Sequence, residues 1–290
     1  MTTVDTVSQE LRTRPRVALV SASAGLLLFA GVVFQSIGAR AKVDEITVQL
    51  LVINKRAALQ VVGGVVNGLG LIALAVTLAF LFRASRARRP EMAQGTILAA
   101  VAGGALSAAA GVISAVVLVT KAHEFATHGA QTYPQANTLL SSSSVTIPQY
   151  VGLLGALGLA VGTVLVSLNA MRVGLLTKFL GYLGIAAAVA SVFFVGAGGI
   201  GLLIQVGWLF ALAYLLAGRW PNGDPPAWRT GQAVPWPSAA ELRDQRQRAT
   251  QSKAAGRGGT GADRPAREPV AAATSSPRSG TPKRKRKRRK

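Results

Sequence analysis

Six stretches without a charged residue or a histidine constrain the fold of this 290-residue chain more than any other feature. A helix needs about 20 predominantly apolar residues to cross a bilayer, because lipid cannot satisfy exposed backbone groups. The stretches that approach or exceed this length are residues 17–37, 59–82, 97–120, 151–170, 179–195 and 200–217. The sequence therefore predicts an all-α, polytopic membrane protein built as a bundle of about six transmembrane helices.

The charge distribution predicts how the chain is threaded. Only 15% of the residues are charged, yet the formal net charge is +21. The basic excess falls in residues 1–16, in the loop after 82, in the loop after 170 and in the tail after 218. With six spans all four regions lie on one side. On the other side, the loop at 38–58 has four basic residues against Asp44 and Glu45, and the loop at 121–150 has Lys121 balanced by Glu124. Because basic loops stay in the cytoplasm, we expect both termini there, in an inner-membrane protein.

The residue inventory disfavours several functional classes. The chain has no Cys and two His, and no acidic or basic residue lies inside a predicted span. Ion-coupled transporters and intramembrane enzymes normally place ionisable groups there, so we expect no enzymatic activity, cofactor or metal. His123 and His128 lie five residues apart, which turns them to different helix faces, and we expect them in a solvated loop. The serines at 141–144 read as a flexible linker.

Three amides stand out inside the predicted spans, namely Asn67, Asn169 and Gln205. A buried amide in lipid needs a partner, and hydrogen bonds between helices are the common solution. The alternative is that these side chains line a path for a small solute.

Glycines four residues apart occur at Gly64 and Gly68 and again at Gly158 and Gly162. Small residues at this spacing let another helix approach closely. The partner is either another helix of the same chain or a second copy, so homo-oligomer formation through these faces stays open.

Two further alternatives concern the first half of the chain. Residues 17–37 followed by Ala39-Arg40-Ala41 resemble a cleavable signal peptide, although the apolar core is longer than such peptides usually have. Residues 42–58 mix apolar and charged side chains, and they form either a helix lying at the outer interface or the start of the second span.

Composition changes abruptly after Gly218. We expect residues 1–16 to be a cytoplasmic segment, 17–218 the transmembrane domain and 219–250 a Pro- and Trp-rich juxtamembrane segment. Prolines predict that 219–237 is not helical, while Ser238 and Glu241 form a capping-box pattern that starts a short helix. Trp228 and Trp236 are expected to pack this segment against the helices. Residues 251–290 lack large apolar side chains and are predicted to be disordered.

Two motifs carry a family resemblance. Residues 169–185 (NAMRVGLLTKFLGYLGI) and 218–246 (beginning GRWPNGDPPAW) are similar to boxes found in actinobacterial multi-pass membrane proteins with no established activity. The resemblance covers residues 150–248. It implies a bacterial membrane protein of about six helices with an ordered segment after the last span, and it implies no catalytic residues.

The chain ends in an uninterrupted basic run outside that resemblance: Lys283, Arg284, Lys285, Arg286, Lys287, Arg288, Arg289 and Lys290. Such a run can contact anionic lipid, nucleic acid or an acidic protein, because attraction to phosphate carries no sequence information. The sequence thus supports a non-enzymatic membrane protein whose basic cytoplasmic tail contacts polyanions. The alternative is a small neutral-solute transporter, channel or sensor that uses the helix bundle.

Overall fold

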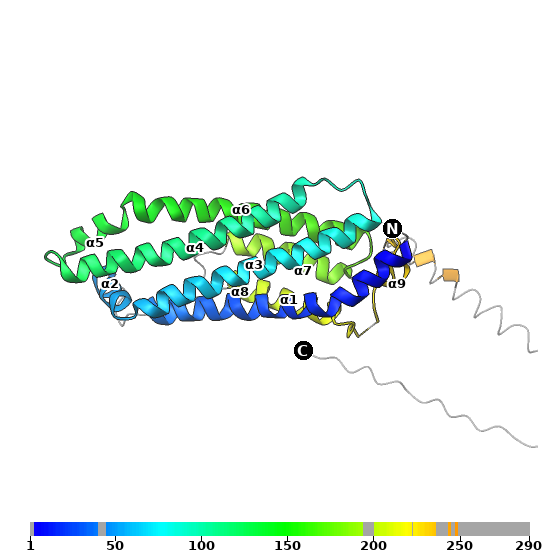
Figure 1. The fold of residues 1–290 in the computed structure, drawn as a ribbon, viewed down its shortest axis with the longest axis horizontal. Coiled ribbons are helices and arrows are strands. Elements are labelled where there is room, and N and C mark those ends of the chain that lie inside the picture. The colour runs from blue at the N-terminus through cyan, green and yellow to red at the C-terminus, as the bar shows by residue number, and fades with distance from the viewer. Residues whose placement is uncertain are drawn as a thin grey trace, which may run out of the picture. The chain divides into compact units, whose positions relative to one another are not determined.

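A computed structural model of the chain confirms the all-α membrane fold (Figure 1). The structure describes residues 3–39, 45–193, 200–221, 223–235, 243–244 and 247–248, with side chains from Ser8 onward. The chain divides into two compact units, Met1–Trp236 and Pro237–Lys290. The predicted short helix after Ser238 lies largely outside the described residues, and the predicted disordered tail lies entirely outside them.

Nine helices are described in the first unit. They are α1 (Thr3–Ala39), α2 (Ile46–Lys55), α3 (Ala57–Arg88), α4 (Gly95–Thr127), α5 (Tyr133–Leu140), α6 (Ser143–Arg172), α7 (Lys178–Phe193), α8 (Ile200–Leu216) and α9 (Pro226–Thr230). Six of them form a closed ring in chain order: α1 packs on α3, α3 on α4, α4 on α6, α6 on α7, α7 on α8, and α8 on α1.

Four helices, α1, α3, α4 and α6, are long and apolar enough to cross a membrane. The other two members of the ring are shorter, with 16 residues in α7 and 17 in α8. At 1.5 Å per residue each extends about 25 Å, somewhat less than the hydrocarbon core of about 30 Å. The six predicted apolar helices are therefore present, but they are unequal in length.

Helices α7 and α8 form the expected antiparallel hairpin. The backbone of Gly201 lies against Ala190, and farther down the pair the Trp208 Nε1 donates a hydrogen bond to the Leu180 carbonyl oxygen at 3.1 Å. Glycine allows this approach, since a Cβ on residue 201 would lie 2.5 Å from the Ala190 oxygen. Most of the connecting GAGGIG sequence lies outside the described residues.

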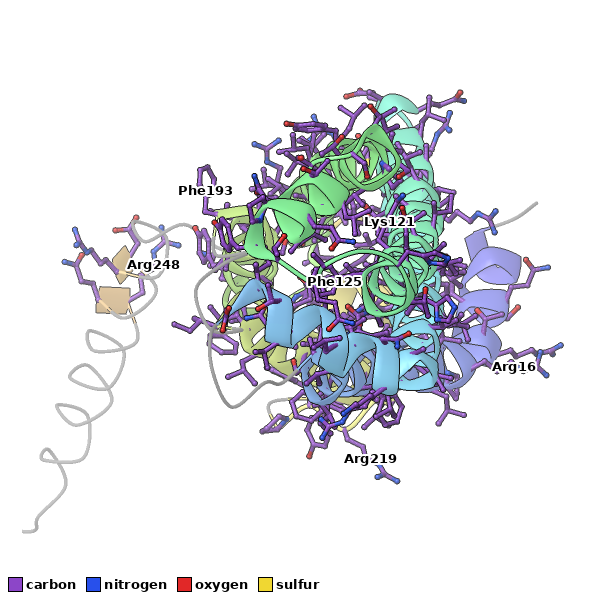
Figure 2. All side chains as sticks on the ribbon, turned by 90° about the vertical axis from the view of Figure 1, so that its left-hand side faces the viewer. Arg16, Lys121, Phe125, Phe193, Arg219 and Arg248 are labelled. Atoms are coloured by element: carbon purple, nitrogen blue, oxygen red, sulfur yellow. The ribbon has the colours of Figure 1, made fainter. Side chains whose placement is uncertain are left out.

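The prediction of a long solvated loop at 121–150 is wrong. Helix α4 continues to Thr127, α5 occupies Tyr133–Leu140, and α6 begins at Ser143 within the serine run. The physical reason is a second apolar core, in which Phe125 and Ala122 of α4 pack with Leu50 and Ile53 of α2. Figure 2, which views the bundle from this end, shows Phe125 among the helices.

The segment after Gly218 is ordered, as expected, but the prediction that it contains no helix is wrong. The short helix α9 begins at Pro226, where proline is tolerated because a first-turn N–H has no helical partner. Trp228 of α9 is 1% exposed, and its Nε1 donates to the Leu175 carbonyl oxygen at 2.9 Å. Its packing against the helices confirms the role expected for Trp228, whereas Trp236 lies outside the described residues.

Both glycine motifs are used inside the chain. A Cβ at Gly64 would lie 2.7 Å from Ala115 of α4, and one at Gly162 would lie 2.6 Å from Ala100 of the same helix. The close approach that small residues permit therefore joins α4 to α3 on one side and to α6 on the other. Helix α2 is a separate ten-residue helix, which agrees with the first of the two alternatives for residues 42–58.

The two ends of the bundle differ in charge. We call them the α9 end, where α1 begins and α8 finishes, and the α5 end, where α2 and α5 lie (Figure 1). The α9 end carries Arg12, Arg14, Arg16, Arg83, Arg86, Arg88, Arg89, Arg172, Lys178, Arg219 and Arg229, with Glu10, Glu91 and Asp224. The described α5 end carries Lys55, Arg56 and Lys121, with Glu45 and Glu124.

Candidate functional site

A cavity of about 450 Å³ lies inside the ring of helices, and every member of the ring contributes to its wall. Its wall is mainly aliphatic, with two amides and three hydroxyls interspersed. The polar lining residues are Asn67, Ser107, Thr163, Ser191 and Gln205. None of the described lining residues is acidic, basic or a histidine, so the cavity offers hydrogen bonds without a formal charge.

Gln205 of α8 is the most unusual of these residues. It is 7% exposed, and its amide nitrogen is buried without a hydrogen-bond partner. Leaving a buried donor unpaired costs about 1–3 kcal/mol, so native proteins rarely do so without a functional reason. Gln205 lines the cavity, but its Nε2 is enclosed by protein atoms, so an acceptor on a ligand would satisfy these N–H groups once the side-chain amide turns toward the cavity.

The three hydroxyl groups in the wall complement this donor. Each donates to a backbone carbonyl: Ser107 to Gly152 at 3.2 Å, Thr163 to Leu159 at 2.8 Å, and Ser191 to Ala188 at 2.8 Å. Their protons are therefore used within the protein, while the oxygen lone pairs stay free to accept. The cavity thus presents hydroxyl acceptors and the Gln205 side chain on otherwise apolar walls.

Asn67 of α3 joins this cavity to a second, smaller one. Its side chain makes no hydrogen bond with another described residue, and it lines both the central cavity and a hollow of about 220 Å³. The second hollow lies toward the α5 end and also contains Gln35, Gln60, Ser114 and Gln149. A series of uncharged polar side chains therefore leads from the α5 end to the central cavity.

Toward the α9 end the cavity is closed by packed side chains. Trp208 lies three residues beyond Gln205 on α8 and is fully buried, as are Leu209 and Leu212. Leu78 and Leu81 of α3 belong to the same apolar core. Packed side chains, mainly apolar, therefore fill the bundle between Gln205 and this end, with the buried hydroxyls of Thr77 and Ser167 among them.

Two buried arginines hold the α9 end together. Arg14 of α1 is 4% exposed and forms a bidentate ion pair with Asp224, each N–O distance being 3.0 Å. It also donates to the Leu215 carbonyl oxygen at 2.9 Å and lies 4.6 Å from the ring centre of Trp228. These contacts tie the segment after α8 to the first helix.

Arg88 of α3 lies near the same tryptophan, 5.4 Å from its ring centre. It forms a bidentate pair with Glu10 at 2.9 and 2.7 Å and donates twice to the Ala227 carbonyl oxygen. Since both carboxylates are paired with guanidinium groups, the cluster acts as a structural clamp around Trp228.

The sequence-predicted site residues fall into three groups. Asn67 and Gln205 come together at the central cavity. Asn169 does not, because its side chain donates to the Leu165 carbonyl of its own helix at 2.8 Å. Lys283–Lys290 lie outside the described residues.

Near the α5 end, His123 and His128 make separate contacts. His123 Nδ1 lies 3.3 Å from Asn54 Oδ1, and His128 Nδ1 lies 2.7 Å from Thr127 Oγ1. No group of three His, Asp or Glu residues suited to a metal occurs in the described part of the chain.

Sequence reasoning missed the amides of the smaller hollow. Gln60 lies just inside a predicted span, and Gln149 lies in the predicted loop. The one signal in the sequence was that these glutamines lie near the ends of apolar stretches.

The clamp formed by Arg14 and Arg88 was also missed. In a basic segment the sequence does not distinguish an arginine that becomes buried from one that stays exposed. No protein-family model, curated protein or solved structure matches the chain.

Proposed function

We propose that the helix bundle binds a small uncharged solute in its central cavity, as a membrane receptor or as one state of a transporter. The observation that carries this proposal is the unpaired amide nitrogen of Gln205, a residue that lines a cavity within a ring of six helices. A volume of about 450 Å³ falls within the range of small-molecule sites, about 300–1,000 Å³.

The wall chemistry defines the class of solute. A charged ligand would be buried without a counter-charge among the described lining residues, at a cost of several kcal/mol. A neutral molecule with an acceptor for Gln205 and a donor for the hydroxyl oxygens, on a mainly apolar frame, fits the wall. The absence of ionisable lining groups also favours binding over catalysis.

Access from the α5 end is part of the proposal. Asn67 links the two hollows on that side, while Trp208 and the leucines around it close the other. Basic residues accumulate at the α9 end, and the positive-inside rule places such an end in the cytoplasm. The cavity would then be reached from outside a bacterial inner membrane, with both termini inside.

Cysteine accessibility tests this proposal, because the natural chain contains no cysteine and every single substitution gives one reactive site. Asn67→Cys and Gln205→Cys should react with a charged methanethiosulfonate reagent applied from the α5 end of the reconstituted chain. Asn169→Cys serves as an intramembrane control outside the cavity and Leu154→Cys as an exposed apolar control. If the cavity positions react no faster than both controls, no water-filled route reaches them and the proposal fails.

The basic run at Lys283–Lys290 supports a second candidate function, contact with polyanions. Each basic residue near an anionic leaflet contributes about 1 kcal/mol, and salt weakens the attraction. The test compares the full chain, reconstituted in neutral nanodiscs, with a chain ending at Pro282. Binding to anionic vesicles that is equal for both chains, or insensitive to salt, would argue against the tail as a polyanion contact.

A further inference from the structure

The outer side of the seam between α3 and α4 ends in a hollow with two arginines. This hollow, of about 510 Å³, lies at the α9 end and is lined by Phe82, Arg83, Arg86, Ala87, Pro90 and Ile97. Arg83 directly follows the apolar residues of α3, so the hollow lies where hydrocarbon meets lipid headgroups.

The arginines in this hollow have no acidic partner in the described part of the chain. Arg83 is exposed and makes no ion pair or hydrogen bond there. Arg86 donates twice to the Gln94 amide oxygen, each at 3.1 Å, in the amide orientation that satisfies both groups. Gln94 is neutral, so both guanidinium charges remain uncompensated.

Neighbouring arginines of the same segment behave differently. Arg88 is paired with Glu10 and Arg89 lies 3.8 Å from Glu91. Within this segment, the two arginines that line the hollow are therefore the two without a carboxylate partner among the described residues, and an anion from outside would compensate their charge.

An apolar hollow continues along the same seam toward the middle of the bundle. It measures about 450 Å³ and is lined only by apolar residues of α3 and α4, including Leu69, Ile72 and Ala105. Residues spaced three, four or seven apart lie on one face of a helix. On α3 this spacing places both hollows on one face, through positions 65, 69, 72, 76, 83 and 86. Val76 and Val101, between the two hollows, are exposed.

The dimensions of the seam suit one lipid molecule. Fifteen residues separate Arg83 from Gly68, which is about 22 Å along the helix. Half of a hydrocarbon core is about 15 Å thick, and Ile72, the α3 lining residue of the apolar hollow nearest to Arg83, lies eleven residues or about 16 Å from it. The near edge of the hollow, at Ile72, is therefore the part that an acyl chain in the same leaflet reaches. A headgroup at the arginines would place an acyl chain along the exposed small and aliphatic residues.

We propose that this seam binds one anionic phospholipid, with its phosphate between Arg83 and Arg86 and an acyl chain along the α3–α4 groove. Paired guanidinium groups recognise phosphate through charge-assisted hydrogen bonds. The apolar continuation of the site selects a lipid over a soluble phosphate. The site is distinct from the central cavity, so either proposal can fail without the other.

The test uses the full chain in detergent, native mass spectrometry and added phosphatidylglycerol or phosphatidylcholine. The natural protein should retain phosphatidylglycerol preferentially. Arg83→Gln with Arg86→Gln should reduce that preference by up to about 30-fold, because each basic residue near an anionic headgroup contributes about fivefold. The matched control, Arg219→Gln with Arg229→Gln, removes the same charge from exposed positions at the same end and should change it little.

A second pair of variants tests the groove. Ala105→Phe fills the apolar hollow and should lower lipid retention several-fold, whereas Ala186→Phe, at an exposed alanine of α7 that lines neither hollow, should not. Equal loss of preference in the two double-arginine variants would overturn the headgroup site. Unchanged retention in Ala105→Phe, or equally strong competition by soluble glycerol phosphate, would overturn the lipid as its occupant.

Discussion

Replacing Gln205 by leucine should stabilise the protein, which is the opposite of what removal of a buried polar group usually does. The Gln205 amide nitrogen is buried without a partner, and such a group costs about 1–3 kcal/mol. Leucine removes that cost and adds apolar surface to a wall that already contains Leu28, Leu71 and Leu74. We expect the free energy of unfolding to rise by about 1–2 kcal/mol.

Gln60 provides the matched control. It is also a buried glutamine of the bundle, at 4% exposed, but its Nε2 donates to the Gln35 carbonyl oxygen at 3.1 Å. Gln60→Leu breaks that hydrogen bond and should lower the unfolding free energy by about 1 kcal/mol. The two substitutions therefore make the same chemical change and are expected to act with opposite signs.

Thermal unfolding in one detergent, followed by tryptophan fluorescence, measures both effects. Trp208 and Trp228 are buried in the same apolar core, toward the α9 end, and report on its unfolding. A change of 1 kcal/mol corresponds to about 2–4 °C in Tm for a domain of this size. If Gln205→Leu lowers Tm as Gln60→Leu does, the Gln205 amide is satisfied in the native protein, and the argument for a ligand site at that residue is refuted.

Two other predictions concern packing and charge. Asp224→Ala leaves the buried Arg14 without its counter-ion and should lower the unfolding free energy by about 3 kcal/mol. Its control is Glu91→Ala, which removes a carboxylate that is 82% exposed and should lower the unfolding free energy by less than about 0.5 kcal/mol. Gly103→Ala should destabilise the bundle by more than about 1 kcal/mol, because a Cβ at this position would lie 2.3 Å from a backbone nitrogen of α6. A Cβ at Gly111 would meet nothing within 4 Å, so Gly111→Ala should stabilise the bundle by up to about 1 kcal/mol through its higher helix propensity. Chemical unfolding of the four variants under identical conditions checks both pairs, and equal effects within a pair would contradict the assigned contacts.

The spans were predictable because the constraint that produces them is one-dimensional. A lipid-exposed segment must be a continuous apolar helix, so composition and length alone locate it. Four predicted segments correspond to helices of 30 residues or more, and two correspond to α7 and α8. Helix ends were predicted less well, because a helix such as α4 runs past the lipid to Thr127 when Phe125 finds an apolar partner there.

The charge pattern was equally accessible from sequence, since it depends on loop composition and not on packing. It distinguishes the α9 end from the α5 end before any contact is known. It could not reveal that Arg14 and Arg88 are buried around Trp228, because their partners are distant in the sequence. Arg14 bonds to Leu215, 201 positions away, and Arg88 bonds to Glu10, 78 positions away.

What the sequence alone determined was the fold class, the approximate helix positions and the presence of Asn67, Asn169 and Gln205 inside them. Only the tertiary structure decided which of these amides line the same cavity. The helices are apolar on all sides, so no hydrophobic stripe indicates how each is rotated. Packing through glycines sets that rotation, and it turns Asn67 and Gln205 toward one cavity while Asn169 bonds to its own helix.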